Sequence, residues 1–411
     1  MKLHLRKNRG MYKEIKYLVF SIILLGHVSA AFGQEFKTVG YLPTYRFYAL
    51  DDLELEKITH LNISFANPNT QGKLTTDGVS IDQVVQKAHE AGVVVYIALA
   101  GAGAPLSTWA PWISPNARTS FISGIVEYVL VHDLQGVDVD LEWGTVNDDY
   151  SGFVLELRDA LANYDLGLSA ALPGTYRYPE ITAEALTAFD WVNLMAYDLT
   201  GPWDPSNPGQ HSPFSFARNS IDYWANQGLP KERMTLGVPF YGYDFTNLNS
   251  IEAVTFAQMV EMGVSNAQKD QVGAIHYNGL ATIEDKTQLA LRELSGVMIW
   301  ELGQDNFGAY SLLDKIHETI KGSLTTSTNR QDEFEISDPY PNPVLDFTEI
   351  KVESLGSIEL TIYNQTLNRI DQQDFLNVQT ISVDMRNYYR GLYFITIKGA
   401  TFIRTFKLIK M

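Results

Sequence analysis

The sequence contains no cysteine, and it has fewer basic than acidic residues. The absence of cysteine excludes disulfides and a lipid anchor attached through a thiol, so the fold must be stabilised by its core alone. With 31 Lys and Arg against 48 Asp and Glu, the formal net charge is −17. A chain of this sign gains nothing from contact with nucleic acid or an anionic membrane, so neither partner is expected.

Long apolar runs are also scarce, and one stands out near the N-terminus. The apolar segment from Tyr17 to Gly26 is too short to span a bilayer comfortably. Basic residues precede it, and small residues follow it at positions 28–31. This order is typical of a secretory signal peptide, so residues 1–33 are predicted to be removed on export, and stable membrane insertion is not expected.

From residue 38 onward, short runs rich in β-branched residues alternate with segments of helical spacing. Each run is almost continuously hydrophobic, which is typical of a parallel strand buried on both faces. The eight strand candidates are Thr38–Leu42, His60–Ala66, Val93–Ala100, Gly136–Glu142, Gly167–Leu172, Trp191–Ala196, Met234–Tyr241 and Gly296–Leu302. Helical spacing lies between them, in residues 81–91, 116–132, 150–164, 221–227 and 286–294. These alternations predict an α/β fold, a (β/α)8 TIM barrel, over residues 36–322.

The character of the chain changes after Gly322. Residues 323–338 are rich in Ser, Thr and Asn, and they are predicted to form a linker. In residues 339–411, apolar and polar residues alternate in short runs at close spacing. This pattern predicts a small antiparallel β-sandwich as a second domain.

The segment from Gly136 to Trp143, GVDVDLEW, places three carboxylates at alternate positions of one strand. Because strand side chains alternate, Asp138, Asp140 and Glu142 share one face, which in a parallel barrel points inward. Buried carboxylates side by side cannot all ionise, so at least one is expected to hold a proton near neutral pH. Glu142 lies nearest the carboxyl end of the strand, where barrel active sites lie, and is the candidate general acid.

A simpler interpretation of the same segment is available. Alternating acidic and apolar residues also describe an ordinary half-exposed strand of an antiparallel sheet. The neighbouring strand candidates are hydrophobic on both faces, however, and this favours a set of inward carboxylates with a catalytic role.

The same segment resembles the active-site strand of the chitinase-like glycoside hydrolases of family 18, whose pattern is D-G-x-D-x-D-x-E. Gly40-Tyr41 resembles the end of that family's first strand. Met195-Ala-Tyr-Asp198 resembles its sixth strand, and the segment GVMIWE that begins at Gly296 resembles its eighth. The resemblance covers residues 36–320.

The resemblance implies a retaining reaction in which the substrate supplies its own nucleophile, an exception to the usual scheme of two carboxylates. By resemblance, Glu142 protonates the leaving oxygen while the 2-acetamido carbonyl attacks the anomeric carbon to give an oxazolinium ion. Asp140 orients the acetamide N–H and shares its charge with Asp138. Tyr197 hydrogen-bonds the acetamide oxygen, and Tyr41 lies beside Asp138.

Further residues are implied as the lining of the substrate site. Met195 and Asp198 flank the same position, and Trp300 is the floor on which the reacting sugar stacks. Trp143 and Tyr241, near strand ends, are candidates for contact with sugar rings. The eight His show no paired spacing typical of a metal site, so no metal and no cofactor is expected.

The chain departs from the family pattern at three places. Gln135 replaces the first Asp, and Ala98 stands where a Ser would support Asp138, so both changes bear on the pH optimum. The segment between strands seven and eight is short. A reduced α+β insertion is expected near residues 277–286, with a shallower and more open groove.

Residues 339–411 resemble the C-terminal sorting domain of the type IX secretion route of Bacteroidota. The resemblance lies in Tyr340-Pro-Asn-Pro343, in Tyr389–Phe394 and in the basic end Arg404–Lys410. It implies the type IX machinery as a partner, export through the periplasm and outer membrane, and a secreted or cell-surface location. The alternative is a carbohydrate-binding module, which the small number of exposed aromatic candidates disfavours.

Three functions follow, in order of preference. The first is a secreted chitinase that hydrolyses β-1,4-linked N-acetylglucosamine. The second is an endo-β-N-acetylglucosaminidase acting on the chitobiose core of N-glycans, and the third is an inactive chitin-binding lectin. A lectin would be expected to lack the acid, and Glu142 is present. A monomer is the expected state.

Overall fold

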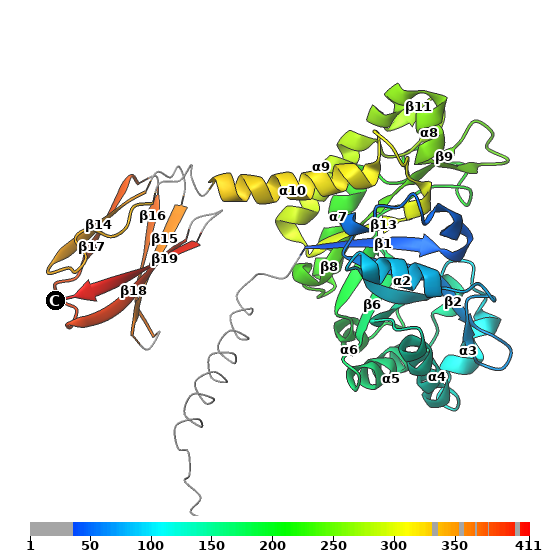
Figure 1. Ribbon diagram of the computed structural model, residues 1–411, viewed down its shortest axis with the longest axis horizontal. Coiled ribbons are helices and arrows are strands. Elements are labelled where there is room, and N and C mark those ends of the chain that lie inside the picture. The colour runs from blue at the N-terminus through cyan, green and yellow to red at the C-terminus, as the bar shows by residue number, and fades with distance from the viewer. Residues whose placement is uncertain (1–35, 331–335, 353–356, 366–367, 377, 399–402) are drawn as a thin grey trace, which may run out of the picture. The chain divides into compact units, whose positions relative to one another are not determined.

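Eight parallel strands pair side by side into a ring, and helices lie outside it (Figure 1). The ring closes because β1 pairs with β2 on one side and with β13 on the other. The strands are β1 Lys37–Pro43, β2 His60–Pro68, β4 Val94–Ala100, β5 Gly136–Asp140, β6 Gly167–Pro173, β7 Trp191–Met195, β8 Met234–Pro239 and β13 Gly296–Trp300. Each coincides with one of the eight strand candidates, so the predicted (β/α)8 barrel is confirmed.

The computed structural model describes residues 36–330, 336–352, 357–365, 368–376, 378–398 and 403–411. It divides into two compact units, residues 1–320 and 321–411. The predicted signal peptide, residues 1–33, lies outside the described residues. Within them, no helix has both the length and the apolar character that crossing a membrane requires.

The helices pack their apolar faces on the outside of the barrel. In α5, for example, Tyr150, Phe153, Val154, Leu157 and Leu161 are fully buried, at the spacing of one helical face. The barrel helices are α2 Asp82–Glu90, α3 Leu106–Ile113, α4 Arg118–Val131, α5 Tyr150–Ala162, α6 Ala183–Ala188, α7 Phe214–Asn226, α9 Leu280–Glu293 and α10 Leu312–Arg330. The main core lies between these helices and the strands.

A small insertion lies between β8 and α9. It consists of β9 Tyr241–Asp244, β10 Glu252–Thr255, α8 Phe256–Met262, η5 Val264–Gln268, β11 Gln271–Val272 and β12 Ile275–His276. The expected position near residues 277–286 is wrong, because α9 already begins at Leu280. Strands of two to four residues carry too few alternations to be recognised in a sequence. The clearest local signal is the capping box of Thr255 and Gln258 at the start of α8.

Helix α10 extends into the segment that composition predicted as a linker. It begins at Leu312 on the barrel and continues to Arg330. Extending a helix adds one hydrogen bond per residue fixed, whereas starting one is costly, so a helix nucleated by packed turns continues through polar sequence.

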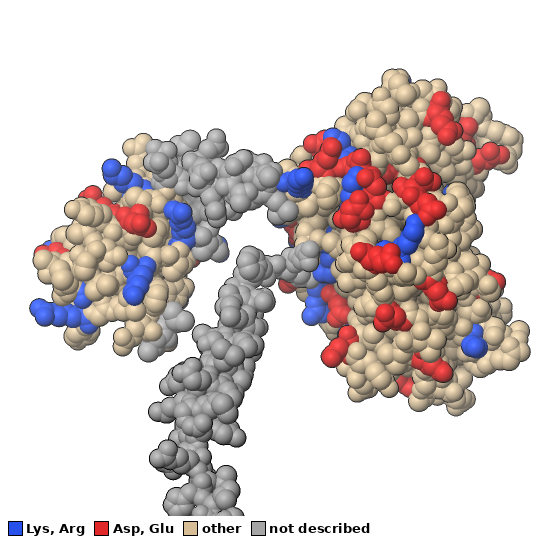
Figure 2. Space-filling model, in the orientation of Figure 1, with Lys and Arg blue, Asp and Glu red and all other residues tan. Residues whose placement is uncertain are grey.

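The C-terminal unit has two antiparallel sheets around its own core. One pairs β14 Phe347–Lys351 with β17 Thr380–Asp384, and the other has the order β16 Arg369–Leu376, β15 Ser357–Asn364, β18 Gly391–Lys398 and β19 Ile403–Lys410. The small β domain is as expected, except that β16 has no counterpart among the alternating runs. Its side chains are mostly exposed at the edge of the sheet, and its apolar residues do not alternate with polar ones. Figure 2 shows acidic side chains scattered over the visible face of the barrel domain and basic ones prominent on the C-terminal domain.

Two glycines of the barrel domain, Gly124 and Gly242, provide a matched test of how closely the chain packs around each of them. A Cβ at Gly124, inside α4, would meet nothing within 4 Å, so Gly124→Ala is expected to raise the free energy of unfolding by about 0.5–1 kcal/mol. A Cβ at Gly242, in β9, would lie 2.1 Å from the carbonyl oxygen of His276, so Gly242→Ala is expected to lower it by about 1–3 kcal/mol. Denaturant unfolding measures both, and a stabilising Gly242→Ala would show that β9 does not pair closely with β12.

Candidate active site

The three carboxylates of the GVDVDLEW segment follow β5 from the inside of the barrel to its carboxyl end. Asp138 is completely buried and Asp140 is 3% exposed. Glu142 lies two residues beyond the last strand residue and is partly buried. The carboxylates therefore form a gradient from the sealed interior to the mouth of the barrel.

Asp138 is held by donors from three other strands. The Tyr41 hydroxyl donates to Oδ2 at 2.6 Å, and Ser169 Oγ donates to Oδ1 at 2.5 Å. Asn193 Nδ2 donates to Oδ1 at 3.1 Å, and its own Oδ1 accepts from Thr235 Oγ1 at 2.7 Å. Burial raises the pKa of Asp138 to about 6, although the three hydrogen bonds favour the ionised form and oppose this shift.

Two of the three departures from the family pattern, Ala98 and Gln135, have different consequences in the structure. Ala98 lies beside Asp138 on β4, and Ser169 lies on the other side of it on β6. A hydroxyl therefore reaches Asp138 from β6, although Ala98 offers none from β4. Gln135 bonds instead to the Val95 N–H at 2.9 Å and to the Asp133 carbonyl at 2.7 Å, before the amino end of β5. The Gln135 side chain thus forms hydrogen bonds at the amino end of β5, whereas Glu142 follows the carboxyl end of that strand.

Asp140 is the least satisfied of the three carboxylates. Among the described residues, its Oδ1 is buried and has no hydrogen-bond partner. Burial raises its pKa well above the usual value, and the negative charges of Glu142 and Asp138 raise it further. A buried acceptor without a donor costs free energy in the free protein, and a ligand N–H can relieve that cost.

The pKa of Glu142 is raised to about 7, chiefly because of burial and then because of the charge of Asp198. The repulsion between neighbouring carboxylates that the sequence predicts also acts here, because burial and then the charge of Glu142 raise the pKa of Asp140. Asp198 follows β7, so its charge comes from another strand end that only the closed barrel brings near.

Aromatic side chains line the barrel around these carboxylates. The ring of Trp300, at the end of β13, stacks on Phe65 at 5.6 Å and meets Tyr41 edge-on at 5.6 Å. Trp300 and Met195 are partly exposed at the edge of this interior cluster. Such a surface suits stacking against the apolar face of a sugar ring.

Tyr197 and Asp198 lie between the carboxylates and the insertion. The Tyr197 hydroxyl contacts Met298 Sδ at 3.7 Å, and burial raises its pKa well above the usual value. The hydroxyls of Tyr241 and Tyr243 both donate to Asp198 Oδ1, the latter at 3.0 Å. The insertion therefore fixes the Asp198 carboxylate through two phenols of β9.

Three residues at strand ends around this site adopt left-handed backbone conformations without being glycine. They are Ala100 with φ 78°, Trp143 with φ 49° and Asp198 with φ 60°. Such residues persist where surrounding contacts determine the backbone, and they concentrate at functional sites. Trp143 is 61% exposed, and its backbone N–H donates to the Tyr178 hydroxyl at 2.9 Å.

All ten predicted site residues thus lie on strands or strand-following turns at the interior or mouth of the barrel. Sequence reasoning missed Phe65, Ser169, Asn193 and His211. Asn193 and Ser169 lie within strand candidates and point inward, so polar residues in an otherwise hydrophobic strand were the available signal. His211 lies in an irregular loop, where no periodic pattern marks it. In the part of the chain that the structure describes, no group of three or more His, Asp or Glu could hold a metal ion.

The model of glycosyl hydrolases family 18 matches residues 37–305, which include every residue of this site. The chain belongs to this family. The crystal structure of the family 18 chitinase ChiB from the chitin utilization locus of Flavobacterium johnsoniae is 43% identical, with a TM-score of 0.69. The match covers 71% of this chain and 96% of that one. A chitinase from Bacteroides thetaiotaomicron is 26% identical with a TM-score of 0.61, over 69% of this chain and 96% of that one.

Other comparisons extend this result. A chitinase-like effector of Moniliophthora roreri is 27% identical over 237 residues, which are 49% of this chain and 58% of that protein. The chain thus spans little more than half the length of that relative. Residues 339–411 match the model of the secretion system C-terminal sorting domain, as the sequence resemblance suggested.

The raised pKa of Glu142 predicts an effect on stability. The unfolded chain ionises this carboxyl near pH 4.5, whereas the folded protein holds the proton up to about pH 7. Lowering the pH from 8 to 5 therefore favours the folded state at this residue. The free energy of unfolding of the wild type, minus that of Glu142→Gln, is expected to rise by on the order of 2 kcal/mol over this range.

Denaturant unfolding of both proteins at several pH values measures this difference. The subtraction cancels the surface carboxylates that both proteins share. A difference that is flat or falls as the pH is lowered would mean that Glu142 titrates normally.

Proposed function

We propose that this protein is a chitinase that hydrolyses β-1,4-linked N-acetylglucosamine with retention of configuration, using Glu142 as general acid and base. The observation that carries the proposal is the pairing of a Glu142 of pKa about 7 with a buried Asp140 oxygen that lacks a donor. One group can supply a proton near neutral pH, and the other can accept an amide N–H.

In the first step, Glu142 donates its proton to the glycosidic oxygen. The acetamide carbonyl oxygen of the sugar attacks the anomeric carbon, the glycosidic C–O bond breaks, and an oxazolinium ion forms. Asp140 accepts the acetamide N–H and stabilises the positive charge that develops on it. Tyr197 donates to the acetamide oxygen, and Trp300 supports the sugar ring from below.

In the second step, the Glu142 carboxylate takes a proton from water. The water oxygen attacks the anomeric carbon, and the bond from that carbon to the acetamide oxygen breaks. The two successive inversions give retention, and Glu142 regains its proton. Asp138, held by Tyr41, Ser169 and Asn193, lies on the same face of the strand as Asp140, and its negative charge adds to the effect of burial in raising the pKa of Asp140.

Export and location form a separate part of the proposal. The sorting-domain match at residues 339–411 supports transport by a type IX secretion system to the cell surface or the medium. The basic side chains of β19, which include Arg404, Lys407 and Lys410, belong to this domain.

The test of the proposed function is the product profile on a soluble N-acetylglucosamine hexamer. The wild-type protein is expected to release dimers to tetramers, and Glu142→Gln is expected to release none while still binding the sugar, because Gln keeps the shape but has no proton to donate. Chromatography of the products measures cleavage, and calorimetry with the variant measures binding.

Two other results would redirect the proposal. An intact hexamer with the wild type would overturn chitinase activity, and release of N-glycans at their chitobiose core would then support the endoglycosidase. Binding without any cleavage, unaffected by Glu142→Gln, would support a lectin.

The cause of the Glu142 pKa predicts the pH dependence of the reaction. Since Glu142 must be protonated to act, kcat/KM is expected to fall as the pH rises through about 7. The charge of Asp198 raises this pKa, so Asp198→Asn is expected to move the basic limb to lower pH. A limb that stays in place in that variant would show that Asp198 does not act on Glu142.

A further inference from the structure

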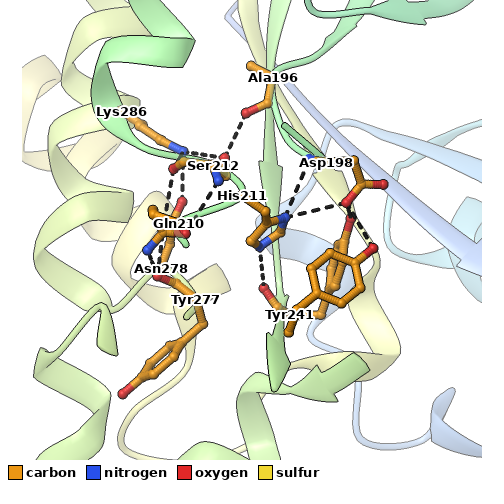
Figure 3. A network of polar contacts seen from close by, with 10 residues as sticks. Ala196, Asp198, Gln210, His211, Ser212, Tyr241, Tyr277, Asn278 and Lys286 are labelled. Carbon is orange, nitrogen blue, oxygen red and sulfur yellow. Dashed lines mark hydrogen bonds and ion pairs between the residues drawn. The ribbon is translucent and has the colours of Figure 1, made fainter. Parts of the chain in front are cut away.

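A short segment that follows β7 contacts the backbone at Ala196 and at Asp198 (Figure 3), the residues before and after Tyr197 in the sequence. The Ser212 hydroxyl donates to the carbonyl of Ala196, the residue before Tyr197, at 2.6 Å. On the other side, the Asp198 N–H donates to His211 Nδ1 at 3.4 Å, and the Leu199 N–H donates to the His211 carbonyl at 2.9 Å. We call residues 210–212 the clamp.

The clamp acts on a strained stretch of backbone. Asp198 has φ 60°, a conformation that side chains other than glycine disfavour. Tyr241 and Tyr243 hold the Asp198 carboxylate, whereas His211 and its carbonyl hold the backbone N–H groups of residues 198 and 199. The orientation of the Asp198 side chain thus depends on contacts that the phenols do not supply.

His211 is itself fixed from the insertion. Its ring is completely buried, and Nε2 donates to the Tyr241 carbonyl at 3.1 Å. With Nε2 carrying the proton, Nδ1 can accept the Asp198 N–H, and Asp198 Oδ1 lies 3.4 Å from the same nitrogen. The ionisable groups around the ring are Asp198, Tyr241, Tyr243 and His276.

The clamp is held from behind by a buried lysine of α9. Lys286 is completely buried, and its Nζ lies 2.7 Å from the Ser212 carbonyl, 2.6 Å from Ser212 Oγ and 2.7 Å from Asn278 Oδ1. Because Ser212 gives its hydroxyl hydrogen to Ala196, all three atoms accept from Lys286. Three acceptors require three N–H donors, which only the ammonium form has.

None of these three acceptors is a carboxylate. Burial lowers the pKa of Lys286 to about 7, and the negative charge of Asp270 opposes this shift. An ammonium without a carboxylate in direct contact is costly to bury unless every donor is satisfied, as it is here. Asn278 reinforces the arrangement by donating from Nδ2 to the Ser212 carbonyl at 3.0 Å, and Gln210 Nε2 donates to the Tyr277 carbonyl. The insertion and α9 are therefore connected to the backbone of Tyr197 through residues 210–212.

We propose that His211 and Lys286 are positioning residues for the reaction. His211 holds the backbone of Asp198, and Lys286 holds the backbone of Ala196 through Ser212. Together these contacts set the orientation of the Tyr197 side chain, which meets the acetamide, and of the Asp198 side chain, which faces Glu142. This inference rests on the proposed function, since it assigns the clamp to roles that Tyr197 and Asp198 have there.

Two substitutions of similar size separate the two nitrogens of His211. In His211→Asn, the side-chain oxygen lies near the place of Nδ1 and can still accept the Asp198 N–H. In His211→Gln, the longer amide reaches the place of Nε2 and keeps only the Tyr241 contact. A residue that merely fills space or joins the insertion to the barrel would tolerate Gln at least as well as Asn.

Steady-state kinetics on the N-acetylglucosamine hexamer, over a range of pH, test the proposal. His211→Gln and Lys286→Met are expected to lower kcat by about tenfold to hundredfold with little change in KM, because a displacement on the order of 1 Å at the reacting groups has effects of this size. In His211→Gln, the basic limb of kcat/KM is expected to move to lower pH as Asp198 leaves Glu142. His211→Asn is expected to keep most of the wild-type kcat and the wild-type limb.

Leu161→Ala is the control for loss of stability alone. Leu161 is fully buried at the last turn of α5, toward the amino ends of the strands, and its truncation is expected to lower the unfolding temperature without changing kcat. Thermal unfolding identifies the temperature at which all variants are folded.

The outcomes are distinct. A wild type that cleaves no hexamer refutes the proposed function. If the wild type is active and His211→Asn and His211→Gln have the same kcat and pH profile, the positioning role of His211 is refuted. It is also refuted if Leu161→Ala loses kcat as well, so that the loss of kcat in every variant simply follows the fall in its unfolding temperature. A folded Lys286→Met with wild-type kcat refutes the role of Lys286. If Lys286→Met does not fold, Ser212→Ala, which removes only the bond to Ala196 and one acceptor, decides that role by the same criterion.

Discussion

The burial of the Asp138 carboxylate constrains the rest of the barrel interior. A fully buried carboxylate is tolerated only with donors around it, and here they come from Tyr41 on β1, Ser169 on β6 and Asn193 on β7. Asn193 in turn accepts from Trp191 and Thr235. Residues from β1, β5, β6, β7 and β8 therefore depend on one another, and the network is complete only when the barrel is closed.

This constraint gives the three carboxylates of β5 different environments. Asp138 has its donors, Asp140 has an oxygen without one, and Glu142 lies at the mouth beside the charge of Asp198. Three carboxyl groups along one stretch of chain thus have three roles in the proposed mechanism. Asp138 is fixed by its donors, Asp140 accepts a hydrogen bond from the substrate, and Glu142 donates the proton. The differences follow from depth in the barrel, because donors and water become available at different points along the strand.

The insertion contributes to the same site from the other side. Tyr241 and Tyr243 of β9 hold the carboxylate of Asp198, and the backbone carbonyl of Tyr241 holds His211. The short sheet after β8 therefore supports the charge that acts on Glu142. Its small size leaves these contacts intact, since they join only β9 to Asp198 and to the segment before α7.

The sequence alone determined the eight strands, the inward face of β5 and the position of Glu142 at the end of that strand. These follow from local periodicity, since alternation along one strand fixes which side chains share a face. The family resemblance added Tyr41, Tyr197, Asp198 and Trp300, which lie at strand ends around the mouth. The two-residue strands of the insertion and the exposed edge strand β16 were not recognised, because neither carries an alternation long enough to detect.

Only the tertiary structure decided which distant residues complete the site. Ser169 and Asn193 reach Asp138 because of strand order and register, and His211 reaches Asp198 because a loop folds back onto the barrel. The pKa of Glu142 likewise depends on burial and on a charge from β7, and neither is visible in the residues next to it. Periodicity describes one strand at a time, whereas donors, charges and burial come from neighbours that only closure of the barrel brings together.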